Sequence, residues 1–384
     1  MLMDAIRTTY AAQLQLRRRM LGAFHQAKNW LAGAAPTNTA QRIQSPGKIL
    51  VVVCGLIGDS VMCAPVVRET KRLWPGAKLT LLGRRHNCML FSSLPEIDEC
   101  HETATNPLGL RNHGQKTSFR RWLASNKFDI AILLLGEDFA HLLASTEIPI
   151  RVGPRQMPLA PCMTHVYDNG TPRTWGPHEK LNSLRALGFE VPDQAPRLAV
   201  SNDSRTSAQR KLLALGLQPQ TPYAVIHPFG SESARWWPMD RAELLSNALL
   251  ARVGLSCVLV GGHEIREQID THKSRGLFDA VGILTIQELS AVLEACAVVI
   301  TTDSGPFHVA GALQRPTIGL FRARRPEHAQ RYPRARVIFG TDRECERKCS
   351  WDRCRSHPCR QMKEISVAQV LDQVEELLAD PCGT

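Results

Sequence analysis

The segment from Ile300 to Phe321 constrains the fold of this chain more than any other part of it. It reads I-T-T-D-S-G-P-F-H-V-A-G-A-L-Q-R-P-T-I-G-L-F. An apolar run ends at Ile300, a polar turn follows, small residues continue to Ala312, and a second apolar run begins at Thr317. This order predicts a strand, a turn, a helix and a strand. In an open parallel sheet, ligands bind at the edge where the strands end, and the unpaired N–H groups of a helix start favour an anion there.

The same alternation recurs in both halves of the chain. Ile49 to Cys54 predicts a buried strand, a helix is expected from Val61 to Trp74, and the next strand covers Lys78 to Leu82. A second pattern of this type begins at Tyr223. We therefore expect an α/β fold in which two Rossmann-like parallel-sheet domains, joined near residues 192–222, enclose a central cleft for substrates.

The chain of 384 residues is too long for one ordinary core, and four parts are expected. They are a basic N-terminal helix and linker at 1–45, an N-terminal Rossmann-like domain at 46–195, a C-terminal Rossmann-like domain at 196–340, and a cysteine cluster with a final helix at 341–384. The first helix suits either an anionic membrane surface or a packing arm with a solvated face.

The net charge of +11 favours an acidic partner, such as an anionic lipid or a phosphorylated substrate, although a solvated basic surface is the alternative. Aromatic residues make up only 6% and do not alternate with basic ones, so a nucleic-acid platform is not expected. No apolar run approaches the roughly 20 residues of a membrane span, and the first residues do not resemble a signal peptide.

Two polar groups that follow expected strands are candidates for chemistry. Asp59, in G-L-I-G-D-S, lies where a general base would face a cleft, or it caps the next helix. In the loop after the strand that ends at His227, Ser231 is a donor for phosphate oxygens and Arg235 is a cation that would neutralise them. The neighbouring tryptophans are expected to pack this loop.

Two further groups complete the set. Glu264, after two glycines, is placed to accept hydrogen bonds from ribose hydroxyls. Alternatively, its negative charge interacts favourably with the dipole at the helix start. Asp303 is an acceptor for sugar hydroxyls, and the N–H groups of Ser304 and Gly305 face where a diphosphate would bind. His308, one turn into the helix, either contacts phosphate or packs the helix.

These motifs together resemble glycosyltransferase family 9, the ADP-heptose:lipopolysaccharide heptosyltransferases, over roughly residues 48–380. The matching motifs are G-L-I-G-D-S-V-M-C-A-P at Gly55–Pro65, R-W-W-P at Arg235–Pro238, V-G-G at Val260–Gly262, T-D-S-G-P-F-H at Thr302–His308 and R-P-T-I-G-L-F at Arg315–Phe321.

The resemblance implies a GT-B fold and a role for each candidate. Asp59 would deprotonate the acceptor, Arg235 would replace the family's phosphate-binding lysine, and Glu264, or Glu267 if the alignment shifts, would hold the ribose. The donor-binding turn would comprise Asp303, Ser304, Gly305 and His308.

The implied activity is metal-independent, inverting transfer of heptose from ADP-heptose to a lipopolysaccharide core acceptor, an anionic glycolipid. The enzyme would be cytoplasmic, with peripheral attachment to the inner membrane, and catalysis would need no cofactor. The alternatives are another nucleotide sugar, a protein acceptor, or a non-catalytic GT-B-like binding protein.

Four of the twelve cysteines are clustered: Cys345, Cys349, Cys354 and Cys359. Their spacing, C-x3-C-x4-C-x4-C, is not that of a standard zinc pair, but four thiols this close are able to ligate a structural metal. Free or reversibly oxidised thiols are the alternative. Several other cysteines lie in apolar runs, as buried free thiols do in a reducing compartment.

Overall fold

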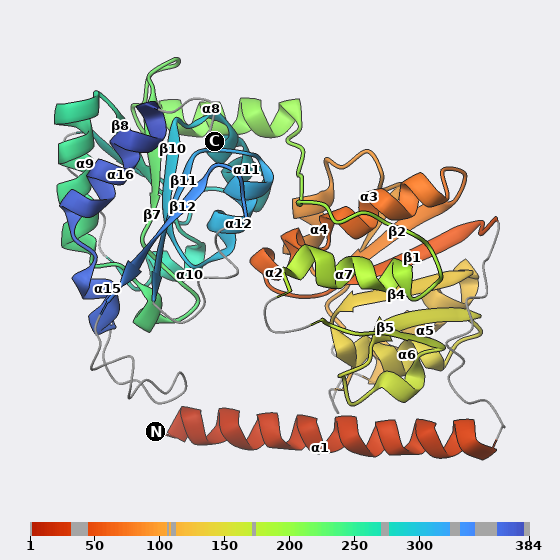
Figure 1. Ribbon diagram of the computed structural model, residues 1–384. Helices are drawn as coiled ribbons and strands as arrows, with labels where there is room; N and C mark the ends of the chain where they lie inside the picture. Colours follow the sequence, from red (N-terminus) through yellow and green to blue (C-terminus); the bar gives the residue numbers. More distant parts are fainter. Residues whose placement is uncertain are drawn as a thin grey trace. The chain divides into compact units, whose positions relative to one another are not determined.

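The computed structural model describes residues 2–31, 45–105, 107–108, 113–170, 174–269, 276–322, 331–341 and 359–379. The chain divides into two compact units, Met1–Gln194 and Ala195–Thr384 (Figure 1). Each unit contains one six-stranded sheet in which all the pairings are parallel. The predicted α/β architecture with two Rossmann-like parallel sheets is therefore confirmed.

The sheet of unit 1 has the strand order β3-β2-β1-β4-β5-β6. Its strands are β1 (Lys48–Val53), β2 (Lys78–Gly83), β3 (Glu99–Glu102), β4 (Ile130–Leu135), β5 (Ile150–Pro154) and β6 (His165–Tyr167). The central strands β1 and β4 are almost entirely buried because helices cover both faces of a parallel sheet. Val52 pairs with Leu82 on one side and with Leu133 on the other, so the loops after these three strands meet at one edge.

The helical segments of unit 1 lie between these strands, except for the first, which precedes β1, and the last, which follows β6. They are α1 (Leu2–Leu31), α2 (Ile57–Val61), α3 (Ala64–Leu73), α4 (Arg85–Phe91), α5 (His113–Asn126), η1 (Glu137–Phe139), α6 (Ala140–Ala144), η2 (Ala160–Cys162) and α7 (Gly176–Arg185). The helix expected from Val61 to Trp74 is present as α3 except at its start, where the chain breaks: Val61 ends the separate helix α2, and α3 begins at Ala64. Pro65 in the first turn of α3 explains the break, since proline lacks an N–H and would clash with the carbonyl of Val61 in a continuous helix.

The sheet of unit 2 has the order β12-β11-β10-β7-β8-β9. Its strands are β7 (Tyr223–His227), β8 (Ser256–Leu259), β9 (Leu277–Asp279), β10 (Val298–Thr302), β11 (Thr317–Arg322) and β12 (Ala335–Gly340). Its described helices are α8 (Asn202–Ala214), η3 (Ser233–Arg235), α9 (Met239–Val253), α10 (His263–Arg266), α11 (Ile286–Ala295), α12 (Gly305–Ala312), α15 (Arg360–Glu364) and α16 (Val367–Ala379). The segment from Ile300 to Phe321 contains the end of β10, all of α12 and most of β11, as predicted.

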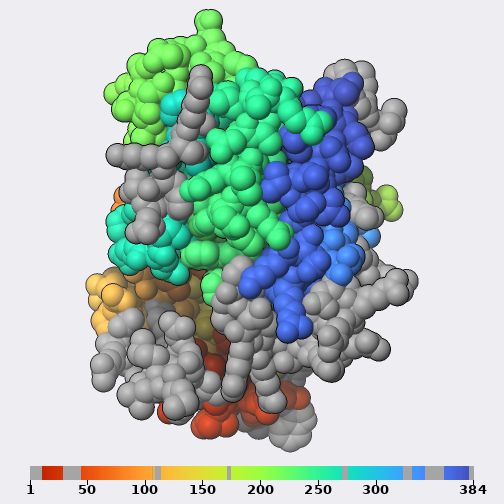
Figure 2. Space-filling view, turned by 90° about the vertical axis from the view of Figure 1, so that its left-hand side faces the viewer, coloured from red at the N-terminus to blue at the C-terminus, as the bar shows by residue number. Residues whose placement is uncertain are grey.

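The last helix completes the core of unit 2. Helix α16 lies beside α9 on the surface of the unit, where Figure 2 shows the two as adjacent blue and green bands. Val370 and Val374 of α16 join the same buried cluster as Leu245 and Leu249 of α9. The 3.6-residue period predicted for residues 366–378 is therefore the packing face of this helix.

Several expectations for the connecting segments are wrong. The region 192–222, expected to be a hinge, contains α8, whose N-cap Ser201 accepts from the N–H of Ser204. The expected loop over 154–178 contains η2 and β6, and the helix expected to reach Ser274 ends at Arg266 within the described residues. These elements are short or rich in polar residues, so apolar periodicity does not reveal them.

Candidate functional site

The carboxyl end of β10 turns into α12 through Ser304, which is the N-cap residue of the helix. The Ser304 hydroxyl makes no cap hydrogen bond to this helix; it lies 3.2 Å from Nδ1 of His227 and 3.1 Å from Oγ1 of Thr301. In the first turn, Pro306 has no N–H and the N–H of Phe307 donates to the Ser304 carbonyl oxygen at 3.1 Å, so the N–H of Gly305 is the donor that the Ser304 side chain leaves for a ligand. Such groups at a helix start are a binding site for phosphate oxygens.

His227 at the end of β7 holds this turn in place, and the sequence motifs did not identify it as a site residue. Its side chain is buried, and burial lowers its pKa to about 4, so the imidazole is neutral at pH 7. Nδ1 of the neutral ring also lies 3.3 Å from Oγ1 of Thr301. The sequence signal that could have identified His227 is a strand that ends in His-Pro next to a strand that ends in two threonines.

Arg235 and Asp303 are brought together, although 68 residues separate them in the chain. The guanidinium Nη1 lies 3.7 Å from Oδ2 of Asp303 and donates to the Asp303 carbonyl oxygen at 3.5 Å. A Cβ on Gly230 would lie 2.7 Å from Cβ of Arg235, so a glycine is needed where the loop passes the arginine. A half-exposed cation therefore lies beside the start of α12, as a diphosphate site requires.

The two tryptophans of the same loop pack it, as expected. Nε1 of Trp236 donates to the Gly230 carbonyl oxygen at 3.0 Å, and Nε1 of Trp237 donates to that of Ile365 at 3.0 Å. Ser231 lies exposed on this loop.

Glu264 lies in the first turn of α10, directly after the glycines that follow β8. Its carboxylate is exposed and lies over Gly262, where any Cβ would collide with it. Glu267, the other candidate for the ribose, is the C-cap residue of the same helix and is exposed as well, with Oε1 3.9 Å from Nδ1 of His263. Both carboxylates are therefore accessible to a ligand.

His308, one turn into α12, contacts Tyr332. Its Nδ1 lies 3.3 Å from the tyrosine hydroxyl, and its ring packs edge-on against Phe307. Burial raises the pKa of Tyr332 well above its usual range, so this phenol stays neutral. A packing role for His308 thus has contacts in the structure, while its predicted role in phosphate binding stays a prediction.

Asp59 is the third residue of α2, and its side chain is exposed. The alternative that it caps the helix is wrong, because Leu56 occupies the N-cap position and no side chain caps α2. The Ser60 hydroxyl instead donates to the carbonyl oxygen of Leu56 at 2.8 Å. Asp59 therefore has no such structural task within its own helix.

The turn that carries Asp59 is held by two residues of α4 that the motifs did not identify. Nδ2 of the fully buried Asn87 lies 2.9 Å from the carbonyl oxygen of Gly55 and 2.8 Å from Oγ of Ser60. Nε2 of His86 lies 2.9 Å from the same carbonyl oxygen. The polar run G-R-R-H-N after β2 was the signal, since β1 and β2 are neighbours and end at the same edge.

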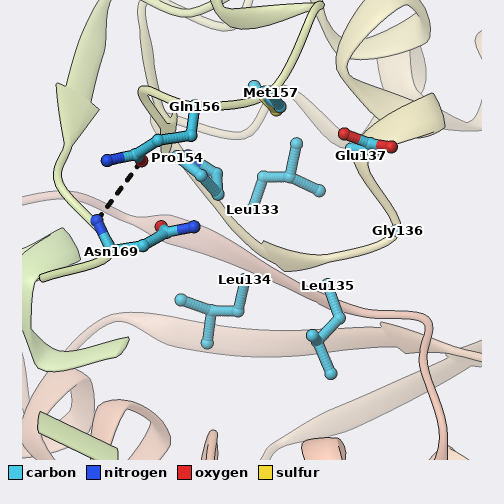
Figure 3. A pocket seen from close by; sticks show the side chains of 9 residues that line it. All are labelled: Leu133, Leu134, Leu135, Gly136, Glu137, Pro154, Gln156, Met157 and Asn169. Atoms are coloured by element: carbon cyan, nitrogen blue, oxygen red, sulfur yellow. Dashed lines mark hydrogen bonds between the residues drawn. The ribbon is translucent and has the colours of Figure 1, made fainter. Parts of the chain in front are cut away.

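A cavity of about 250 Å³ lies at the carboxyl ends of β4 and β5 (Figure 3). It is lined by Leu133, Leu134, Leu135, Gly136, Glu137, Pro154, Gln156, Met157 and Asn169. Its floor is apolar, and Oε1 of Gln156 accepts from the N–H of Asn169 at 3.3 Å. Because β4 adjoins β1, this cavity opens on the same sheet edge as the turn that carries Asp59.

The cysteine cluster is only partly within the described residues. Cys345, Cys349 and Cys354 lie outside them, whereas Cys359 is buried at the N-cap of α15 and its N–H donates to the Ala234 carbonyl oxygen at 3.2 Å. Among the described residues, no three His, Cys, Asp or Glu side chains are grouped to hold a metal ion. None of the described helices has the length and apolar content that crossing a bilayer needs.

The sequence matches the model of glycosyltransferase family 9 (heptosyltransferase) over residues 116–358. Lipopolysaccharide heptosyltransferase 3 of Escherichia coli K12 is 26% identical over 293 residues, which are 69% of this chain and 80% of the relative. The crystal structure of a family 9 glycosyltransferase from Veillonella parvula has a TM-score of 0.72 at 22% identity and covers 90% of this chain and 100% of its own. E. coli heptosyltransferase WaaC, solved with ADP-2-deoxy-2-fluoro heptose, has a TM-score of 0.63 at 18% identity and covers 86% and 99%.

The two parallel-sheet units and these structural neighbours show that the chain has the GT-B fold. The family match extends over more than half of the chain, so the chain belongs to glycosyltransferase family 9. It is accordingly an enzyme of the heptosyl-transfer type.

Proposed function

We propose that this enzyme transfers a heptose from ADP-heptose to a lipopolysaccharide core acceptor by inverting displacement without a metal ion. The observation that carries the donor half is the position of Arg235 and Asp303 beside the first turn of α12. A cation next to the N–H groups of Ser304 and Gly305 suits a diphosphate, and a carboxylate suits sugar hydroxyls. The names of the relatives supply the sugar: several are lipopolysaccharide heptosyltransferases, and one was solved with an ADP-heptose analogue.

In this reaction the acceptor hydroxyl oxygen attacks the anomeric carbon of the heptose. Asp59 takes the hydroxyl proton, the bond between the anomeric carbon and the diphosphate oxygen breaks, and ADP leaves with the electron pair. Arg235 and the N–H groups of Ser304 and Gly305 stabilise the charge that develops on the diphosphate. Glu264 holds the ribose hydroxyls, and Ser231 and His308 contact the phosphates.

The site of action follows from the acceptor. A lipopolysaccharide core is an anionic glycolipid, so the enzyme works in the cytoplasm at the inner membrane surface. The net charge of +11 supports an anionic acceptor.

Replacing Asp59 with asparagine tests the assignment of the base. The expected result is a loss of turnover of about 100-fold or more, with unchanged affinity for ADP-heptose, because a general base contributes about 10² to 10⁴ in rate. Glu190→Gln, which neutralises another exposed carboxylate of unit 1, is the matched control and should retain full turnover. Full turnover of Asp59→Asn would refute the assignment of the base. If UDP- or GDP-sugars protect the enzyme from unfolding as well as ADP-heptose does, the assignment of the donor is refuted.

For the cysteine cluster both interpretations stay open, a structural metal or free thiols. The N–H of Cys359 bonds to the loop that carries Arg235, so order in the cluster would stabilise that loop. Elemental analysis of the purified enzyme, compared with a Cys349→Ser/Cys354→Ser variant, distinguishes them: stoichiometric metal that is lost in the variant indicates ligation.

A further inference from the structure

Helix α1 has an inner face that is fastened to unit 1. Arg18 pairs with Glu137 at 2.8 Å and with Asp138 at 2.7 Å. Nε2 of His25 lies 3.0 Å from Nδ1 of His141, and a Cβ on Gly22 would collide with the Pro158 carbonyl oxygen. These contacts hold one side of the helix against α6, η1 and the segment before η2, which fixes the side that faces outward.

The outward face carries an exposed apolar stripe, defined as Leu16, Met20 and Phe24. Their exposed fractions are 60%, 63% and 61%. Residues four apart lie one above the other on a helix, so the three side chains form one continuous row. Among the described residues, the other four exposed large apolar side chains lie singly: Leu213 on α8, Leu244 on α9, and Leu56 and Ile283 outside the helices and strands. Three exposed apolar side chains in one row are better explained by a surface that a partner covers than by chance.

Cationic side chains flank the stripe on both sides. A helix advances by about 100° per residue, which places Arg19 on one flank and Arg17 and Lys28 on the other. Residues 2–31 contain five Arg or Lys residues and one acidic residue, Asp4. An apolar centre between cationic flanks is the arrangement of helices that lie in the surface of an anionic membrane.

A cavity of about 350 Å³ adjoins the stripe. It is lined by Arg17, Met20, Leu21, Pro107, Leu108, Lys116 and His141. Burial, Arg17 and Arg120 lower the pKa of Lys116, which shows that positive charge is crowded here. The cavity thus has apolar walls beside Met20 and cations near its lining. This chemistry is complementary to a phospholipid, whose acyl chains are apolar and whose head group is anionic.

We propose that α1 is a membrane-docking helix that lies flat on an anionic bilayer, with Leu16, Met20 and Phe24 inserted between the lipid head groups. This attaches unit 1 to the surface where a glycolipid substrate is anchored. A second copy of this chain is a poorer occupant, because pairing two α1 helices would bring their cationic flanks together without acidic partners. The inference does not depend on the sugar that the enzyme transfers.

Vesicle flotation of the full chain tests the proposal without any sugar substrate. The wild type should bind vesicles of phosphatidylglycerol and phosphatidylethanolamine and fail to bind phosphatidylcholine vesicles. Replacing the stripe by serine (Leu16→Ser/Met20→Ser/Phe24→Ser) should reduce the partition coefficient by at least about 100-fold, since each side chain loses most of its apolar transfer. The matched control is Ala11→Ser/Gln15→Ser/Gln26→Ser, which makes three serine changes at exposed positions away from the stripe and should bind as the wild type does.

A charge variant and an assembly measurement complete the test. Arg19→Gln/Lys28→Gln should weaken binding about 25-fold at low salt, because each cation near an anionic surface contributes about fivefold. Wild-type binding by the stripe variant, or equal binding to neutral vesicles, would overturn the proposal. The proposal would also be overturned if the wild type does not bind vesicles and instead forms a dimer in light scattering that the stripe variant does not form. Circular dichroism of each variant confirms that α1 is still helical.

Discussion

Asn87 is the residue whose replacement should most directly disturb the turn that carries Asp59. Its amide Nδ2 serves Gly55 and Ser60, while its Oδ1 accepts from the N–H of Arg84 at 2.9 Å. Asn87→Ala removes all three hydrogen bonds from a fully buried position. The three groups that lose a bond differ in the hydrogen-bond partners that they keep, and this difference determines how far the free energy of unfolding falls.

Ser60 still donates to Leu56, and the Gly55 carbonyl oxygen keeps the contact with His86, so these two groups lose one partner each. The N–H of Arg84 loses the acceptor that the Asn87 side chain provided. At about 1 kcal/mol net for each bond, the free energy of unfolding should fall by about 3 kcal/mol. Because a misplaced catalytic group costs up to about 100-fold in rate, turnover should fall at least tenfold while the affinity for the donor stays unchanged.

Urea unfolding and steady-state kinetics on the same preparation measure both effects. Asn182→Ala is the control: Asn182 also makes two side-chain hydrogen bonds in unit 1 but is half-exposed, so its loss should cost less than about 1 kcal/mol. Asn87→Asp keeps the acceptor for Arg84 but points a carboxylate at the Gly55 carbonyl oxygen, and should lose turnover as well. A change within about 0.5 kcal/mol for Asn87→Ala, with normal turnover, would refute the reasoning.

Two further predictions concern unit 2. Thr285 and Glu288 form a capping box at the start of α11, so Thr285→Ala should lower the free energy of unfolding by about 1 kcal/mol in urea titrations, whereas Thr285→Ser should be nearly neutral. His227 has a folded-state pKa of about 4 against about 6.5 when unfolded, so the unfolded state takes up the proton first as the pH falls. The urea midpoint should therefore decrease between pH 6.5 and 4 and be insensitive to this group above pH 6.5; His227→Asn, which cannot titrate, should lack this part of the slope.

The central strands were predictable because parallel strands covered on both faces are continuous apolar runs. K-I-L-V-V-V in β1 and Y-A-V-I-H in β7 are of this kind. The edge strands were not predictable in this way: β3 reads E-C-H-E and β12 is half-exposed along most of its length. Helix α8 begins N-D-S-R-T-S, which resembles a linker, and only the cap at Ser201 identifies its start.

The candidate ligand groups were predictable because strand ends meet at one edge of a parallel sheet, whichever strands are neighbours. The residues that support them required the strand order and register. Asn87 reaches Ser60 because β1 lies beside β2, and His227 reaches Ser304 because β7 lies beside β10. Neither neighbour relation is encoded in the spacing of these residues along the chain.

Both units hold an Asp-Ser pair in place at the edge of the sheet in a similar way. An Asp-Ser pair follows a central strand in each, Asp59-Ser60 after β1 and Asp303-Ser304 after β10. In each pair the serine hydroxyl is engaged by a buried side chain from a neighbouring strand or the helix after it, Asn87 in unit 1 and His227 in unit 2. The Ser304 side chain makes no cap hydrogen bond to α12, Ser60 lies within α2 and is not its N-cap, and neither aspartate is buried. The buried partner therefore fixes the turn, while the carboxylate and the helix start stay accessible to substrate.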